Sequence, residues 1–400
     1  MKASAGKRVL MWLENNPYPG DPRVRQEAEV LVSSGYQVSV ICPASPKQPW
    51  REKIDGVYVI RYPAPPAANS FLGYLWEYGY SFLASFVLSL LVSFHPGFDV
   101  IHAANPPDTA VFIAAFYKLF GKRFVYDHHD LAPEMYWARF GGKGNRFVHQ
   151  MLIQLEKLSC RLADHVIATN ESYKTVEMQR GRVPEERITI VRNGPDLDLL
   201  KPGEPAPNLF QKGEVIIGFA GTMGIQDGVD YLLRALHCLL KDLGRTDFYC
   251  VMIGKGIAWI SLQALATDLD LNEHVWFTGY IPDADLIKYL STVDICVDPD
   301  PSNPFNNRCT MIKMMEYMAF GKPIVAFDLP EHRVTAQDAA LYARPNDELD
   351  FARQIVALMD DPERRRFMGQ QGRERVEKEL AWSYQKEFLL DMYAKLCASV

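Results

Sequence analysis

The chain has 400 residues, 48% hydrophobic and 23% charged, which is the composition of a soluble protein long enough for two domains. Its seven cysteines are odd in number and include no C-x-x-C pair, which argues against a disulfide framework or a zinc site and favours a reducing cytosol. Residues 1–195 hold 22 Lys and Arg against 18 Asp and Glu and the remainder holds 21 against 31, giving +4 and −10, and the absence of a basic run interleaved with aromatics speaks against a nucleic-acid partner.

The first half of the chain reads as an alternation of buried strands and helices. Two helical patterns are clearest, at residues 24–34 and 147–162. Short apolar runs bounded by Gly, Pro or Asp predict parallel strands, because both faces of such strands are covered. These runs are KRVLMWL, YQVSVICP, FDVIHAA, KRFVYD, ADHVIAT and RITIVRNG. The apolar run near the N-terminus is too short for a secretory signal, so none is expected.

The longest uncharged stretch, YSFLASFVLSLLVSF at residues 80–94, is shorter than the roughly 20 apolar residues that a transmembrane helix needs. Ser81, Ser85, Ser89 and Ser93 recur at every fourth position, so one ridge of the predicted helix is small and suits close packing inside a domain. Trp76 precedes the stretch in the manner of an interfacial belt. A helix that dips into a lipid interface is therefore the alternative interpretation.

The second half repeats the alternation of strands and helices. Its predicted elements are the strands EVIIGFAG, FYCVMIG, HVWFTG, DICVDP and KPIVAFD, with helices at residues 227–243 and 283–291. The seam between the two series is rich in Pro, Gly and Asn, at residues 193–214. We therefore expect two doubly wound Rossmann-like α/β domains, at residues 1–196 and 197–382, followed by a helical pattern at 382–396.

Polar residues and glycines follow two of the predicted strands. In open α/β sheets ligands bind at the carboxyl ends of strands, so two such domains predict a cleft between them. His129 and Asp130 follow KRFVYD and can reach a substrate there, whereas His128 points the other way and is assigned to the core. Gly221 and Gly224 follow another strand, where they let a phosphate approach the backbone at a helix start; tight packing of the turn explains them equally well.

The stretch TMIKMMEYMAFGKPIVAF predicts a helix followed by a buried strand. Its methionines fall at i, i+3, i+4 and i+7, the pattern of a stripe that faces the core, and are Met311, Met314, Met315 and Met318. Lys313 and Glu316 share the opposite face, and two interpretations stay open. Either they form a solvated i,i+3 pair, or Lys313 with Arg308 and the helix N-terminus neutralises a leaving phosphate while Glu316 accepts hydrogen bonds from sugar hydroxyls.

Six segments of the chain, taken in order, carry a resemblance to a known family: YDHHDLAPE, ATNESY, VRNGPD, GFAGTMGIQDGVDYLLRAL, FTGYIP and TMIKMMEYMAFGKPIVAFD. Together they resemble the GT-B glycosyltransferases of the retaining family 4, over nearly the whole chain. The resemblance implies two Rossmann-like domains facing across a cleft, with a C-terminal helix at 383–400 crossing back to the first domain. It also implies that the second domain holds a nucleotide-diphospho-sugar, with UDP or GDP as the nucleotide, and the first domain the acceptor. No metal and no cofactor are implied.

The resemblance also assigns roles to individual residues. Glu316 matches the glutamate that binds the ribose hydroxyls, and His129 matches the histidine that lies over the donor sugar; with Lys313 and Arg308 they form the expected catalytic set. The implied donor-binding set is Gly221, Thr222, Met223, Gly224, Asp227, Gly254, Gly279, Tyr280, Ile281, Thr310, Met311 and Ile312. The expected acceptor-binding set is Asn16, Tyr18, Arg23, Asp130 and Glu134. For Arg23 a surface ion pair is the alternative.

Three positions depart from the family pattern. Thr222 and Asp227 stand where the family commonly has a basic pair that grips the diphosphate, and Arg308 stands where the first of two family glutamates would lie. A dissociating diphosphate needs compensating charge wherever the scaffold can supply it. The hypothesis is that Arg308 and Lys313 take over this role.

The predicted partners follow from the charge and from the aromatic segment at residues 71–94. A basic first domain favours a saccharide or polyprenyl-linked acceptor in surface polysaccharide assembly, with a cytoplasmic enzyme in peripheral contact with an anionic inner membrane face. Two alternatives remain. One is a GT-B epimerase that releases an isomerised nucleotide sugar, and the other is a silent nucleotide-sugar-binding protein, since fold does not fix function.

Overall fold

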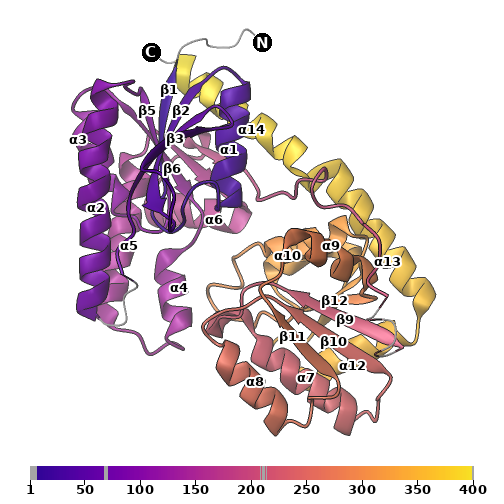
Figure 1. Cartoon of the computed structure of the whole chain (residues 1–400). Coiled ribbons are helices and arrows are strands. Elements are labelled where there is room, and N and C mark those ends of the chain that lie inside the picture. The colour runs from indigo at the N-terminus through magenta and orange to yellow at the C-terminus, as the bar shows by residue number, and fades with distance from the viewer. Residues whose placement is uncertain (1–6, 67–70, 208, 210–211, 213, 399–400) are drawn as a thin grey trace. The chain divides into compact units, whose positions relative to one another are not determined.

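The computed structural model describes residues 7–66, 71–207, 209, 212 and 214–398. The chain forms two compact units, one of Met1–Asn193 with Gln385–Val400 and the other of Gly194–Tyr384. We call them unit 1 and unit 2. Each is built on its own sheet, and Figure 1 labels the elements.

Unit 1 contains an eight-stranded sheet in the order β3-β4-β2-β1-β5-β6-β7-β8. The strands are β1 (Arg8–Trp12), β2 (Gln37–Ala44), β3 (Arg51–Ile54), β4 (Val57–Pro63), β5 (Val100–Ala104), β6 (Arg123–His128), β7 (His165–Ala168) and β8 (Ile188–Ile190). All six predicted strands are confirmed. The β3–β4 pair is antiparallel and was not predicted, although Asp55 and Gly56 at its turn have φ of 47° and 89°, the conformation that an Asp-Gly hairpin turn favours.

The helices of unit 1 cover both faces of this sheet. They are α1 (Pro22–Ser33), α2 (Phe71–Phe94), α3 (Ala110–Lys118), α4 (Ala132–Arg139), α5 (Arg146–Leu162) and α6 (Glu171–Val176). The last helix, α14 (Trp382–Ala398), enters unit 1 at Gln385. Helix α1 begins at Pro22 because Asp21 accepts a hydrogen bond from the Val24 amide and Pro fits the first helical position.

Unit 2 contains a parallel six-stranded sheet in the order β11-β10-β9-β12-β13-β14. Its strands are β9 (Val215–Ala220), β10 (Phe248–Ile253), β11 (Val275–Gly279), β12 (Ile295–Asp298), β13 (Ile324–Phe327) and β14 (Ala340–Ala343). Its helices are α7 (Val229–Lys241), α8 (Trp259–Asp268), α9 (Asp283–Thr292), α10 (Ile312–Ala319), α11 (Pro330–Ala336), α12 (Glu348–Met359) and α13 (Pro362–Arg375). The five predicted strands are confirmed, and β14, a run of only four residues, was not predicted.

The methionine stripe predicted for α10 is confirmed for three of its four members. Met314, Met315 and Met318 are fully buried in the core, whereas Met311 precedes the helix as its N-cap and is half-buried. The helix ends at Ala319, and Gly321 follows with a φ of 65°. Lys313 is thereby placed on the first turn of α10, on the side that faces away from these buried methionines.

In both sheets the strand order reverses beside the first strand. In unit 1, β1 lies between β2 and β5, and in unit 2, β9 lies between β10 and β12. The connections from neighbouring strands leave in opposite directions at such a point, which opens a crevice at the carboxyl ends of the strands. Two clusters of buried charged residues lie at these edges, one in each unit. The fold class predicted from the sequence is confirmed.

Candidate active-site residues in the two units

The centre of the unit 1 cluster is Asp127, near the carboxyl end of β6. Its carboxylate is fully buried and accepts hydrogen bonds from Arg23 Nη2 at 2.7 Å and Arg23 Nε at 3.0 Å. His129 Nε2 lies 2.6 Å from Asp127 Oδ2. Burial opposes ionisation of this carboxyl, but the charges of Arg23 and His129 outweigh it and hold its pKa well below the ordinary range. Asp127 is therefore a fixed negative charge.

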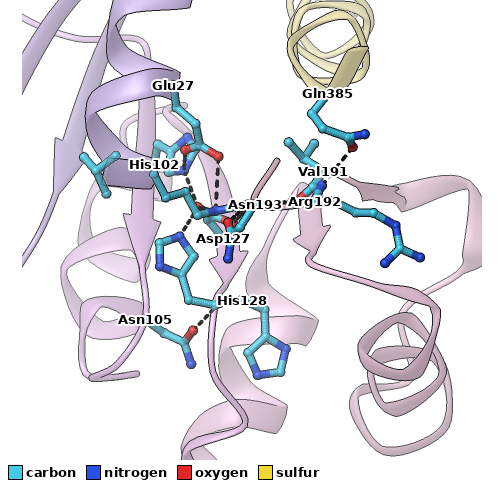
Figure 2. A network of polar contacts seen from close by, with 12 residues as sticks. Glu27, His102, Asn105, Asp127, His128, Val191, Arg192, Asn193 and Gln385 are labelled. Atoms are coloured by element: carbon cyan, nitrogen blue, oxygen red, sulfur yellow. Dashed lines mark hydrogen bonds and ion pairs between the residues drawn. The ribbon is translucent and has the colours of Figure 1, made fainter. Parts of the chain in front are cut away.

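His102, on the neighbouring strand β5, joins the same cluster. Its Nε2 lies 3.2 Å from Glu27 Oε2 and 3.3 Å from Asp127 Oδ2, and its Nδ1 is 2.8 Å from the Tyr393 hydroxyl. Figure 2 shows Glu27, His102 and Asp127 turned toward one another. Burial lowers the pKa of His102, but the charge of Glu27 and the bonds to Asp127 raise it to about 9. This imidazole is charged at neutral pH.

His129 is oriented by both its backbone and its ring. Its amide donates to Asn105 Oδ1 at 2.6 Å, and the amide of Asp130 donates to the same oxygen at 3.1 Å. Because Nε2 is held by Asp127, the ring nitrogen left for a ligand is Nδ1, for which no hydrogen bond is found among the described residues. The structure thus leaves one nitrogen of a fixed ring to meet a substrate.

Other predicted residues of unit 1 take part in internal contacts. Arg23 is 6% exposed and also donates to the Val191 carbonyl and to Asn193, so the surface ion pair considered for it is wrong and its guanidinium is engaged inside the unit. Glu134 is bonded by Arg180 through both carboxylate oxygens, at 2.6 and 3.0 Å.

The remaining unit 1 predictions differ in exposure. Tyr18 is fully buried, Asn16 is exposed, and burial raises the pKa of the partly exposed Asp130. The core role of His128 is confirmed, since it is fully buried with Nδ1 3.2 Å from Glu177. Asn16, Asp130 and His129 are therefore the predicted unit 1 residues whose side chains reach the surface.

The centre of the unit 2 cluster is Lys313, on the first turn of α10. Its ammonium lies 2.6 Å from Asp300 Oδ2 and 3.2 Å from Asp298 Oδ1, and both carboxylates are buried. The solvated Lys313–Glu316 pair considered from the sequence is not observed, because Lys313 pairs with these two aspartates. Burial disfavours its charge, but the two carboxylates outweigh burial and raise the pKa of Lys313 above its usual range.

The two aspartates that hold Lys313 differ from each other. Burial disfavours ionisation of Asp298, but Lys313 and then His332 lower its pKa below the ordinary value. Burial and the charge of Asp298 instead raise the pKa of Asp300 well above its ordinary value. Lys313 therefore lies between two buried carboxyls whose pKa values are shifted in opposite directions.

Three predicted glycines of unit 2 meet at the ends of β9, β10 and β11. Gly221 donates to the Ile253 carbonyl at 2.9 Å, and Gly254 donates to the Gly279 carbonyl at 3.1 Å. A Cβ on Gly254, whose φ is 124°, would lie 1.9 Å from the Gly221 carbonyl oxygen, so only glycine allows this approach. The Lys313 side chain runs beside the same loop, since a Cβ on Gly221 would lie 3.8 Å from Lys313 Cδ.

Asp227 and Met223 limit which groups of the glycine loop can contact a ligand. Asp227 Oδ2 accepts the Gly224 amide at 2.6 Å, so the chain's own carboxylate already covers this donor. Met223 is fully buried in the core, which leaves its backbone for any contact with a ligand, while Thr222 is exposed. Positive charge near the loop therefore comes from Lys313 rather than from the loop residues.

The other predicted donor-side residues lie around α10 and β11. Burial raises the pKa of Glu316, and the charge of Lys313 acts in the opposite direction. Arg308 donates to the Pro304 carbonyl at 3.2 Å, a contact separate from the aspartates that hold Lys313. Thr310 donates to Glu331 at 3.3 Å. Tyr280 and Ile312 are exposed, and Ile281 is partly buried against the core.

Among the described residues, two groups of side chains have donor atoms near enough to hold a metal ion: Glu27 with His102 and Asp127, and Asp298 with Asp300 and His332. In the first group Arg23 is already bonded to Asp127, and in the second Lys313 is bonded to both aspartates. A metal ion would have to displace a cation of the protein at either place. Arg23 and Lys313 thus occupy the carboxylate oxygens that a metal ion would need.

Besides His332, which lies 3.7 Å from Asp298, sequence reasoning missed five residues of these clusters: Glu27, His102, Asp127, Asp298 and Asp300. A signal was present for three of them, because Asp127 and Asp298 lie near the carboxyl ends of the predicted strands KRFVYD and DICVDP and Asp300 directly follows the second, at the ligand-binding edge of the fold. The other two, Glu27 and His102, lie inside a predicted helix and a predicted strand, and nothing local marks them. Their role follows from the pairing of β5 with β6.

Comparison with known proteins identifies the family. Residues 23–199 match the model described as Glycosyltransferase Family 4, and residues 214–361 match Glycosyl transferases group 1. Alpha-maltose-1-phosphate synthase from Mycolicibacterium smegmatis is 26% identical over 304 residues, 70% of this chain and 75% of that protein.

Two solved structures show the same fold along their whole length. Sucrose-phosphate synthase from Thermosynechococcus elongatus has a TM-score of 0.82 at 19% identity, and Anabaena HepE in complex with UDP and glucose has a TM-score of 0.73 at 16% identity; each match covers 99% of this chain and 100% of the other. Since both family models match in order and the fold agrees, the chain belongs to the GT-B glycosyltransferases of family 4.

Proposed function

We propose that the protein transfers a sugar, with retention of anomeric configuration, from a nucleotide-diphospho-sugar to a hydroxyl of a saccharide or polyprenyl-linked acceptor. Unit 2 binds the donor and unit 1 the acceptor. The reaction uses no metal and no cofactor, because charge on the leaving diphosphate is met by side chains of the protein. The enzyme acts in the cytoplasm, in peripheral contact with an anionic membrane.

The observation that carries this proposal is the placement of Lys313. Its ammonium lies on the first turn of α10 beside the Gly221 loop, where free helix amides add partial positive charge. A departing diphosphate develops negative charge, and preorganised cations stabilise that charge at no cost of reorganisation. The Lys313 side chain keeps 13% of its surface exposed, so it can still meet a phosphate oxygen.

His129 and Glu316 supply the remaining contacts to the donor. Asp127 holds the His129 ring at Nε2, so Nδ1 is presented in a fixed direction to the transferred sugar. Glu316 lies one helical turn after Lys313 and accepts hydrogen bonds from the ribose hydroxyls. Retention then needs no strong base on the protein, since the leaving diphosphate itself can accept the proton of the incoming hydroxyl.

Uridine is the first nucleotide to test, because HepE, which shares the fold, was solved with UDP and glucose. The experiment is a thermal-shift panel of UDP-, GDP-, ADP- and dTDP-sugars against wild type and Glu316→Ala. One nucleotide sugar should raise the melting temperature of the wild type and lose that effect in the variant. If none raises it, the donor assignment is rejected and the silent-protein alternative gains support.

Turnover of the donor identified in that panel tests Lys313. Replacement of Lys313 by Ala should lower kcat by about two to three orders of magnitude, as for removal of other preorganised charge donors. Lys288→Ala is the matched control, because Lys288 forms an exposed pair with Asp285 on α9. An unchanged kcat in Lys313→Ala would reject the role. Isomerised nucleotide sugar formed without any acceptor would indicate an epimerase instead.

A further inference from the structure

Helix α2 turns its polar residues inward and its apolar residues outward. The close packing predicted for the serine ridge is confirmed for three of its four members: Ser81, Ser85 and Ser89 are buried, whereas Ser93 is half-buried, and Ser89 lies 3.0 Å from the Tyr117 hydroxyl. The outward positions are apolar and exposed: Leu83 60%, Val87 48%, Leu91 55% and Phe94 88%. A helix that faces water normally has the opposite arrangement. Packing within unit 1 therefore does not explain why these apolar residues of α2 are exposed.

The apolar surface continues over the two neighbouring helices. Phe82 and Phe86 of α2 contact Phe112 and Phe116 of α3, with ring centroids 6.4 and 5.2 Å apart, and α3 packs against α5 (Figure 1). Further large apolar residues are exposed on or directly after α3 and on α5, namely Phe112, Leu119, Phe120, Phe147, Met151 and Leu158. We call the outer surface of these three helices the α2–α3–α5 face.

The charges near this face are mostly positive. Segments 71–94, 110–122 and 138–162 contain seven cations, Lys118, Lys122, Arg139, Lys143, Arg146, Lys157 and Arg161, against two acids, Glu77 and Glu156. Glu156 is buried and paired with Arg180, while Lys118 and Lys122 are paired with Asp164 and Asp99. The other five cations form no ion pair with the described residues.

The connection from α4 to α5 combines both features. Phe140 and Phe147 are 56% and 77% exposed, and the exposed Arg139, Lys143 and Arg146 alternate with them along the chain. Exposed aromatic rings with cations beside them suit the boundary between lipid headgroups and acyl chains, where rings enter the apolar layer and cations meet anionic headgroups.

We propose that the α2–α3–α5 face and the α4–α5 connection dock on an anionic lipid bilayer. Residues 76–94 are long and apolar enough to cross a membrane by length and composition, with mean hydropathy 1.3, so the expectation that this segment is too short was wrong. Three serines of its ridge are nevertheless buried in the domain, and α2 contacts β2 and β4. Helix α2 therefore lies on the bilayer instead of spanning it. This inference rests on the proposed function and deepens it, because it assigns the proposed contact with an anionic membrane to named residues of unit 1.

The test is sedimentation of the full chain with vesicles of phosphatidylcholine, with and without about one third phosphatidylglycerol. The wild type should sediment with the anionic vesicles at low salt, less at high salt, and little with neutral vesicles. The triple variant Leu83→Gln, Leu91→Gln, Phe94→Gln should bind at least about tenfold more weakly, because its apolar contact is lost. Lys143→Glu with Arg146→Glu should lose the preference for anionic vesicles.

The matched control is Ile257→Gln with Ile260→Gln, which removes two residues of unit 2 that are 81% and 80% exposed. It should bind vesicles as the wild type does, and all variants should keep the wild-type melting temperature. Failure of the wild type to sediment, or unchanged binding by the triple variant, would overturn the docking surface. A wild-type dimer that the triple variant dissociates, without vesicle binding, would assign the face to a second copy of the chain.

Donor binding separates the two proposals. A chain that gains thermal stability with a nucleotide sugar but ignores vesicles keeps the sugar-transfer function and loses the docking surface together with the proposed membrane contact. A chain that binds anionic vesicles through this face but responds to no nucleotide sugar has the opposite outcome. The thermal-shift measurement needs no acceptor and no membrane, so the two results are independent.

Discussion

Asp127 Oδ2 lies 2.6 Å from His129 Nε2, and Arg23 bonds both oxygens of the same carboxylate. One buried aspartate therefore fixes the ring that we assign to the donor sugar and also neutralises a buried arginine. Asp127 is a positioning residue, since it acts through His129. Its replacement should affect both stability and turnover, but for different reasons.

Asp127→Asn should destabilise the protein by about 3–5 kcal/mol, because Arg23 and His102 keep Glu27 but lose the other carboxylate that compensates them in the interior. Urea unfolding measures the change. Asp99→Asn is the matched control and should cost less than about 1 kcal/mol, since its pair with Arg8 is more than one third exposed on both sides. Equal losses in the two variants would show that the Asp127 cluster is no more important to stability than a surface pair.

The positioning role of Asp127 has a kinetic signature. If the ring of His129 is released, kcat of donor turnover should fall in Asp127→Asn while the donor KM changes little, because the interaction is made mainly in the transition state. Asp127→Glu, which keeps the charge, should recover part of kcat. A KM increase with constant kcat would mean that Asp127 supports donor binding only.

Removal of Lys313 should make the free energy of unfolding depend on pH. In Lys313→Met the buried Asp298 loses its cation, so its folded pKa should rise above the unfolded value near 3.8. The folded state then binds a proton that the unfolded state releases, and stability falls as pH rises from about 4. Unfolding at pH 5 and pH 8 should show a larger loss at pH 8, and adding Asp298→Asn should remove most of that difference. A pH-independent loss would contradict this assignment.

His102 should stabilise the protein mainly at the lower pH values. Its folded pKa is about 9, above the ordinary 6.5, so its contribution is complete below pH 6.5 and is lost as pH rises through 9. His102→Gln should therefore cost more free energy of unfolding at pH 6 than at pH 9.5. His165→Gln is a control of opposite sign, since burial lowers the pKa of His165 to about 4, and its replacement should cost less free energy of unfolding at pH 6 than at pH 9.5.

The sequence predicted these clusters only in part, and the reason is physical. Hydrophobic periodicity is local, so it located the strands and the α10 stripe. The partners of buried charges are set by strand register: His102 is opposite Val125, which places Asp127 two residues further along the same face. Arg23 reaches Asp127 across 104 residues of chain, and no local pattern encodes that distance. The Asp55–Gly56 turn, by contrast, was a local signal that predicts the missed hairpin.

The Glu14 carboxyl should make the protein less stable as pH rises, whereas an ordinary ion-paired carboxylate makes a protein more stable. It is 8% exposed, and burial together with the nearby charge of Glu77 raises its pKa from 4.5 to about 8. Between these values the folded state holds a proton that the unfolded state has released, so the free energy of unfolding falls by up to about 1.4 kcal/mol for each pH unit. Glu14→Gln, which is neutral at every pH, should stabilise the protein at pH 7.5 much more than at pH 5. Glu52→Gln, whose carboxylate is 34% exposed beside Arg61, should show no such gain. A Glu14→Gln effect that is equal at both pH values would mean that the native carboxyl is already ionised at pH 5.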